Sequence, residues 1–147
     1  MGDYYGLRVR GILKEQFRQP IYKAAFEPPT HTLPISFWGL VAKETSSPEI
    51  LKWMKVRRSN FIPRGILCYM PWKEDDLDWE HTVDTCSGRW QFQCSLKSKS
   101  TIDYFWVNVC PLIFQEITHF EVYDEVLATS THYNLQKQTQ CRDKKSD

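Results

Sequence analysis

Residues 87–100 read SGRWQFQCSLKSKS, and large apolar side chains alternate with polar ones along most of this stretch. Side chains of a β-strand point alternately to opposite faces, so a period of two predicts a strand with one apolar and one polar face. The apolar face carries Trp90, Phe92, Cys94 and Leu96. The polar face carries Arg89, Gln91, Gln93 and Ser95.

The aromatic pair on this strand, Trp90 and Phe92, permits two interpretations. RNA-binding domains stack bases on rings of a central strand, and the spacing here is compatible with that use. However, the apolar row continues through Cys94 and Leu96, whereas the opposite row is wholly polar, as on a solvated sheet face. We therefore expect the two rings to lie in a hydrophobic core and the polar row to face away from it.

The chain of 147 residues is long enough for one domain with its own core. Its 19 Lys and Arg residues almost balance 18 Asp and Glu residues, so the formal net charge of +1 gives no overall attraction to nucleic acids or anionic membranes. No apolar run approaches the roughly 20 residues that cross a bilayer, and we expect a soluble, cytoplasmic protein with no membrane partner. Five cysteines without a CxxC pair indicate reduced thiols: Cys68, Cys86, Cys94, Cys110 and Cys141.

Four segments have the signals of strands. Residues 4–13 place Leu7, Val9, Gly11 and Leu13 on one face, and residues 66–70, 89–96 and 118–126 complete the set. Between the second and third strands, the acidic residues 72–87 are predicted to form a long surface loop.

Two segments have the signals of helices. Ser47 as N-cap and Pro48 at the first position predict a helix to about residue 57, with Ile50, Leu51, Trp53 and Met54 facing inward. The second helix is expected to be capped by Ser100 and to extend to residue 117, with a bend at Pro111. Residues 14–47 are compatible with either a short helix or an irregular excursion.

The order strand, helix, strand, strand, helix, strand predicts an α+β fold. Four antiparallel strands with two helices on one face would form the split βαβ arrangement of ferredoxin-like domains, with a long loop between the second and third strands. We assign residues 1–128 to a single domain and residues 129–147 to a polar C-terminal tail.

The polar face of this sheet is the candidate binding surface. Arg8 and Arg10 on the first strand would join Arg89, Gln91 and Gln93 on the third, and guanidinium groups with neutral amides suit a phosphate or an acidic partner. Such arginines are also common as solvated surface residues, and an open sheet face is also used to form homo-oligomers.

Three further candidates lie in turns and loops. Arg64 sits in a Pro-Arg-Gly turn, and Trp72 and Trp79 lie in the acidic loop, where each ring either is available to a ligand or is buried by the loop folding back. The predicted ligand-binding set is thus Arg8, Arg10, Arg64, Trp72, Trp79, Arg89, Gln91 and Gln93.

Neither a metal site, a cofactor nor a catalytic set is predicted. His31, His81, His119 and His132 are interpreted as dispersed, with no metal-binding HxxxH, HxH or HxE pair, and the acidic loop around His81 and Cys86 has no calcium-loop register. Phosphate-cradling loops, nucleophile elbows and deaminase signatures are missing from the sequence. A small hydrolase stays open as an alternative, because a two-residue acid–base site leaves no motif.

Four stretches together resemble a group of uncharacterised small proteins of phages and prophages of Gram-positive bacteria. They read YYGLRV from Tyr4, RSNFIPRGILCYMPW from Arg58, GRWQFQCSLKSKSTIDYF from Gly88 and VCPLIFQEITHFEVYDE from Val109. The group has no assigned activity, so the resemblance implies provenance alone. A small phage accessory protein in the cytoplasm of a bacterial host is expected to block or sequester a host component.

These observations lead to a ranked set of functions. The first is a phage-encoded accessory binding protein that counteracts a host defence by binding a host protein or by sequestering a nucleotide signal. The combination of Arg with Trp and Tyr suits phosphates and bases. The second is a single-stranded nucleic-acid-binding module that uses the arginine-bearing sheet face. The third is the small hydrolase.

Overall fold

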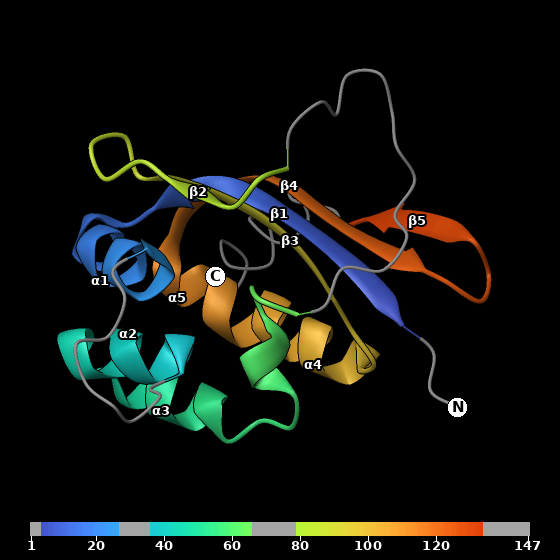
Figure 1. Ribbon diagram of the computed structural model, residues 1–147, viewed down its shortest axis with the longest axis horizontal. Helices are drawn as coiled ribbons and strands as arrows, with labels where there is room; N and C mark the ends of the chain where they lie inside the picture. The colour runs from blue at the N-terminus through green and yellow to red at the C-terminus, as the bar shows by residue number, and fades with distance from the viewer. Residues whose placement is uncertain (1–3, 27–35, 66–78, 134–147) are drawn as a thin grey trace, which may run out of the picture.

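The computed structural model describes residues 4–26, 36–65 and 79–133. They form an α+β fold, as predicted, with an antiparallel sheet of five strands in the order β2-β3-β1-β4-β5. The described helices lie on one face of this sheet (Figure 1). The strands are β1 (Tyr5–Leu13), β2 (Thr82–Val83), β3 (Arg89–Leu96), β4 (Phe114–Asp124) and β5 (Thr129–His132).

Helical segments fill the layer below the sheet. They are α1 (Glu15–Phe26), α2 (Phe37–Thr45), α3 (Pro48–Met54), η1 (Ser59–Phe61), α4 (Lys99–Tyr104), η2 (Phe105–Val109) and α5 (Cys110–Ile113). The last three follow one another without a break, and η2 is a π-helical turn. Within the described part of the chain, none of the helices combines the length and hydropathy needed to cross a membrane.

The inward direction of the β3 rings is confirmed. Trp90 and Phe92 are fully buried and contact rings of the helical layer, Phe37 of α2 and Phe105 of η2. Trp90 lies parallel to Phe37 of α2, at a centroid separation of 6.0 Å, and to Phe114 of β4, at 5.7 Å. Trp38 meets Trp90 edge to face and donates from Nε1 to the carbonyl oxygen of Ile62 at 2.5 Å. These rings therefore belong to the hydrophobic core.

The connection between β2 and β3 differs from the predicted long loop. The predicted strand at 66–70 lies outside the described residues, whereas β2 falls inside the predicted loop. A short turn joins β2 to β3, because Asp84 Oδ1 accepts from the backbone amides of Cys86 at 2.9 Å and Ser87 at 3.3 Å. Gly88 then takes a φ of +84°, which only glycine adopts freely.

The helix before β4 begins and ends earlier than predicted. Its N-cap is Ser98, whose hydroxyl accepts from the amide of Thr101 at 3.2 Å, in place of Ser100. It ends at Ile113, and β4 begins at Phe114, so the prediction that the helix reaches residue 117 is wrong. Pro111 has no amide hydrogen to donate, and the π-helical turn η2 comes directly before the α5 turn that contains it.

The predicted polar tail begins with a strand. Residues 129–132 form β5, which pairs with β4 in the register Glu121↔His132 and Tyr123↔Ser130. The prediction of a tail is therefore wrong for residues 129–132. Their side chains are polar and carry no apolar strand pattern, but such side chains suit a strand at the edge of a sheet. The rest of the predicted tail beyond Tyr133 lies outside the described residues.

The first half of the helical layer contains more helix than predicted. Residues 14–47, left open by the sequence, include both α1 and α2, and Pro20 lies inside α1. Helix α3 begins as predicted, with Ser47 Oγ accepting from the amide of Ile50 at 3.3 Å. It stops at Met54, and the predicted burial of Leu51 and Met54 is wrong, because a helix this short buries only one narrow face.

Replacing Phe92 with alanine tests the core. The change removes a fully buried ring and leaves a cavity, so the free energy of unfolding should fall by about 3–5 kcal/mol. Urea denaturation measures the loss. The control is Arg89→Ala on the same strand, where the side chain is exposed and the change should stay within about 0.5 kcal/mol. Equal effects of the two substitutions would contradict the assignment of the rings to the core.

Candidate functional site

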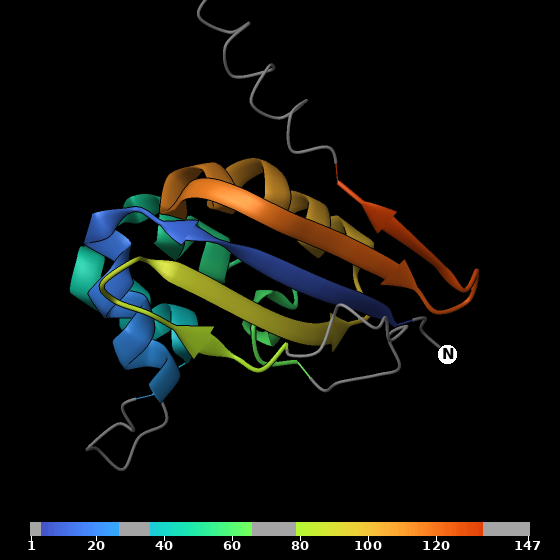
Figure 2. The ribbon, with the colours of Figure 1, turned by 90° about the horizontal axis from the view of Figure 1, so that it is seen from above.

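The polar side of the sheet brings four predicted ligand-binding residues together. In register, Arg8 of β1 lies between Gln93 and Glu121, and Arg10 lies between Gln91 and His119. Arg8 Nε donates to Gln93 Oε1 at 2.6 Å, and Arg10 Nε donates to Gln91 Oε1 at 3.0 Å. Figure 2 shows β1 between β3 and β4 from this side. Arg8 and Arg10 therefore each use a guanidinium N–H to bind a predicted ligand-binding residue on the neighbouring strand.

Trp79, also in the predicted set, covers the middle of this cluster. Its ring centroid lies 4.2 Å from the guanidinium carbon of Arg10 and 4.8 Å from the ring of His119. Its ring is buried, which is the second of the two alternatives that the sequence left open. Arg8 and Gln91 are only 4% and 6% exposed, so the expectation of a free polar face is wrong here.

Glu121 lies at the centre of the polar cluster, and its side chain is fully buried. Its Oε1 is 3.0 Å from His119 Nε2, 3.7 Å from Arg8 Nη1 and 3.8 Å from His132 Nε2. Burial alone raises the pKa of this carboxyl, but the surrounding His119, Ser130, Arg8 and His132 outweigh it and lower the pKa to about 2. The carboxylate is therefore ionised throughout the neutral range.

The remaining predicted residues are spread over the molecule. Arg89 is exposed at the end of the polar side, where it lines a shallow hollow of about 280 Å³ with Arg10 and Thr118. Arg64 lies away from this surface, and its Nη2 donates to the carbonyl oxygens of Ala24 at 2.6 Å and Ala25 at 2.9 Å. These hydrogen bonds hold the turn that contains Arg64 against α1. Trp72 lies outside the described residues.

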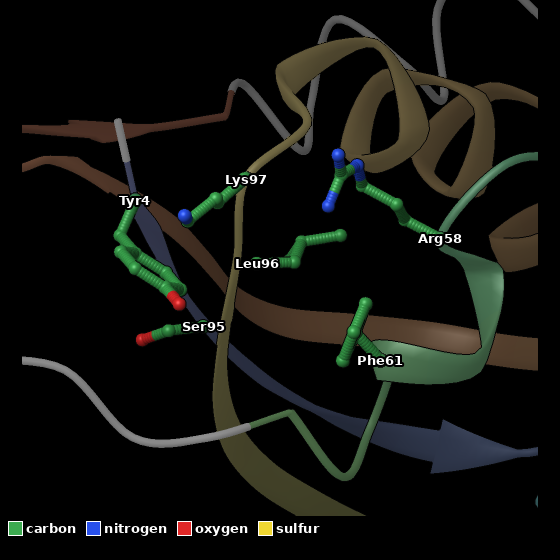
Figure 3. Close-up of a pocket in the computed structure, with 6 residues that line it drawn as sticks. All are labelled: Tyr4, Arg58, Phe61, Ser95, Leu96 and Lys97. Carbon is green, nitrogen blue, oxygen red and sulfur yellow. The ribbon is translucent and has the colours of Figure 1, made fainter. Parts of the chain in front are cut away.

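A second concavity, which we call the strand-end pocket, opens where β3 ends beside the start of β1. It has a volume of about 170 Å³ and is lined by Tyr4, Arg58, Phe61, Ser95, Leu96 and Lys97. Figure 3 shows Tyr4 and Lys97 on one side and Arg58 and Phe61 on the other, with Leu96 between them. The pairing of Tyr5 with Leu96 at the sheet end brings Tyr4 next to Lys97.

Two cations line the strand-end pocket, and no described acidic side chain pairs with either of them. Lys97 Nζ lies 4.9 Å from the ring centroid of Tyr4, and neither Lys97 nor Arg58 has an acidic partner among the described residues. Arg58 has a φ of +67°, a left-handed conformation that costs a non-glycine residue energy and is frequent at ligand sites. Two cations and two aromatic rings in one pocket suit an anion that carries a flat ring.

The strand-end pocket was not predicted. Its lining comes from the residue before β1, from η1 and the residue before it, and from the end of β3 with the residue that follows, and no short motif joins these three segments. The prediction that the chain has no HxE pair is wrong, because His119 and Glu121 are two residues apart and both side chains lie on the same face of β4. With His132, these residues have donor atoms within 4.8 Å of one another, close enough to share a metal ion.

Comparison with protein-family models, with curated proteins and with solved structures finds no match to this chain.

The substitution Glu121→Gln tests the charge balance of the polar cluster. A folded-state pKa of about 2 against an ordinary 4.5 means that ionised Glu121 stabilises the fold by up to about 3 kcal/mol above pH 4.5. This contribution is lost as the pH falls from 4.5 towards 2. The variant should therefore be less stable than the wild type at pH 7, and the difference should shrink in acid.

Denaturation with urea at a series of pH values measures this difference. Glu116→Gln is the matched control, because Glu116 is exposed on the same strand and should change stability little at any pH. A stability difference between wild type and Glu121→Gln that is constant from pH 7 to pH 2 would show that the charge of Glu121 does not stabilise the fold.

Proposed function

We propose that this chain is a phage-encoded accessory binding protein, and that it counteracts a host defence by sequestering a nucleotide signal in the strand-end pocket. The observation that carries the proposal is that Arg58 and Lys97, which lack acidic partners among the described residues, line one pocket with the rings of Tyr4 and Phe61. Guanidinium and ammonium groups bind phosphate, and aromatic rings stack on bases.

The size of the pocket limits how the ligand is held. A volume of about 170 Å³ is below the 300–1,000 Å³ that encloses most small ligands. It admits one ring or one phosphate group, and the rest of the ligand extends along the surface. We expect a base to be held near Tyr4 and Phe61, and a phosphate to contact Arg58 and Lys97. The substrate class is therefore a mono- or dinucleotide, linear or cyclic.

The role against a host defence rests on the resemblance to phage proteins in the four sequence stretches. A protein that removes a signal by binding needs no catalytic group, which is compatible with the lack of a catalytic motif in the sequence. Binding of a host protein is the other form of this proposal. In either form, the protein acts in the cytoplasm of the bacterial host.

A single-stranded nucleic-acid-binding module is the second candidate function. The observation that favours it is the hollow between Arg10 and Arg89, which lies on the polar side of the sheet beside the Thr118 side chain. Phosphate contacts there would make binding sensitive to salt. Self-association through this face is a further proposal, and the molar mass in solution tests it.

We also infer a ferredoxin-like arrangement for four of the strands. The order β2-β3-β1-β4 with antiparallel neighbours supports it, because β3 lies between β1 and β2 as in a split βαβ unit. β5 would then be an addition at the β4 edge. Open sheets of this kind leave their strand ends accessible, which is where the strand-end pocket lies.

Thermal unfolding with a panel of mono-, di- and cyclic nucleotides tests the proposed ligand class. A nucleotide at a hundred times its dissociation constant should stabilise the wild type by about 2.7 kcal/mol and raise its melting temperature. The double substitution Arg58→Asn and Lys97→Gln should weaken binding at least tenfold. Asparagine is chosen because it tolerates the left-handed backbone at position 58.

The control for this experiment is the double substitution Arg57→Gln and Lys55→Gln. It removes the same charge from neighbouring exposed side chains that do not line the pocket, so affinity should change little. Binding that both double variants weaken equally would place the ligand elsewhere, and no stabilisation by any nucleotide would overturn the sequestering form of the proposal. Recovery of the bound nucleotide unchanged, measured by chromatography, separates sequestration from hydrolysis.

A further inference from the structure

We propose that His119, Glu121 and His132 bind a divalent transition-metal ion, with zinc as the preferred candidate. The proposal concerns the polar cluster and does not depend on the strand-end pocket or its ligand. Two imidazoles and one carboxylate are a common protein ligand set for zinc and for non-haem iron.

Sheet geometry brings the three ligands to one point. His119 and Glu121 are two residues apart on β4, so their side chains share a face. His132 on β5 is the direct register partner of Glu121, and side chains in such cross-strand pairs lie close together. The two imidazole rings are 5.2 Å apart and nearly perpendicular, at 85°.

The separations of the donor atoms fit a shared ion. Ligands at about 2.0–2.2 Å from a tetrahedral zinc lie about 3.3 Å from one another. Here Glu121 Oε1 is 3.0 Å from His119 Nε2 and 3.8 Å from His132 Nε2, and all donor atoms lie within 4.8 Å of one another. Shifts of a few tenths of an ångström in the side chains would complete the coordination.

A buried oxygen without a hydrogen-bond partner is an independent sign of a ligand at this place. The second carboxylate oxygen of Glu121, Oε2, is buried and makes no hydrogen bond in the described part of the chain. The neighbouring Ser130 hydroxyl interacts with the Glu121 carboxylate, whose pKa it lowers, and has no other partner among the described residues. Buried polar atoms are almost always satisfied, so an ion or a metal-bound water is the expected partner.

The positive charge of Arg8 limits the affinity of the proposed site for a metal ion. Its Nη1 is 3.7 Å from Glu121 Oε1, and this positive charge opposes a cation at the same oxygen. The Arg8 Nε–H is directed to Gln93 at 2.6 Å, so part of the guanidinium is held away from the carboxylate. We therefore expect binding that is weaker than in a structural zinc site with thiolate ligands.

The site would be open on the side of His132. This side chain is 48% exposed, whereas that of Glu121 is fully buried. Three protein ligands leave a fourth position of a tetrahedral zinc for water or a small anion. The metal would also join the edge strand β5 to β4, so it should stabilise the fold.

Calorimetric titration of the full chain with Zn²⁺, and absorption spectroscopy with Co²⁺, test the proposal. We expect one equivalent of metal at this site and a rise in melting temperature. The Co²⁺ spectrum should show nitrogen and oxygen ligation without a thiolate charge-transfer band, which distinguishes this site from the cysteines. His132→Ala should weaken binding at least tenfold.

His132 is the first position to change because its exposed side chain can be removed without opening the core. Glu121→Gln is the second variant and should also lose at least tenfold in affinity. Cys86→Ser is the control, since it removes an exposed potential metal ligand that does not belong to the proposed site, and it should bind metal like the wild type. Lack of binding by the wild type, or equal affinity of wild type and His132→Ala, would overturn the proposal.

Discussion

The alternation of side chains along β1 and β3 is the constraint on which the structure depends. These central strands pair in a register that sets Val9 opposite Phe92 and Leu7 opposite Cys94, and all four are buried beneath the helices. A slip of one residue would turn every side chain to the other face and bring Arg8 into the core. The helices can cover only the apolar face, so the polar groups of both strands must find partners on the other side.

The polar side chains on the other side of the sheet find these partners by pairing with one another. Placing an unpaired carboxylate in a buried position costs several kcal/mol, and Glu121 avoids this cost through Arg8 and two imidazoles. Trp79 then shields the cluster from solvent. The residue types that suggested a binding surface thus largely hold the sheet together, whereas the cations that line the strand-end pocket, Arg58 and Lys97, have no acidic partner among the described residues.

Strand β5 connects the polar cluster to the helical layer. It supplies His132 to the polar side, and the next residue, Tyr133, turns towards the helices and donates from its hydroxyl to Asp103 of α4 at 2.5 Å. Burial, followed by the bond to Asp103, raises the pKa of Tyr133 to about 12, so this donor keeps its proton at neutral pH. The edge strand is therefore held at its C-terminal end, which fixes His132 opposite Glu121.

Several features could be predicted from the sequence because their causes are local. The period of two in residues 89–96 identified the strand and the direction of Trp90, and Ser47 with Pro48 marked the start of α3. Each signal lies within a few neighbouring residues. The prediction that the helices lie on one face of the sheet followed from the single apolar row in residues 89–96.

The tertiary structure alone decided which distant residues meet. β2 and β5 are short and polar, so neither has a periodic signal, and both form only because a neighbouring strand offers its hydrogen-bonding edge. The presence of Arg58 and Lys97 in one pocket, and the approach of His132 to Glu121, depend on strand register and on chain turns far apart in the sequence. Local patterns determine what each segment is, whereas long-range pairing determines which side chains form a site, since cross-strand contacts leave no trace in the order of the residues.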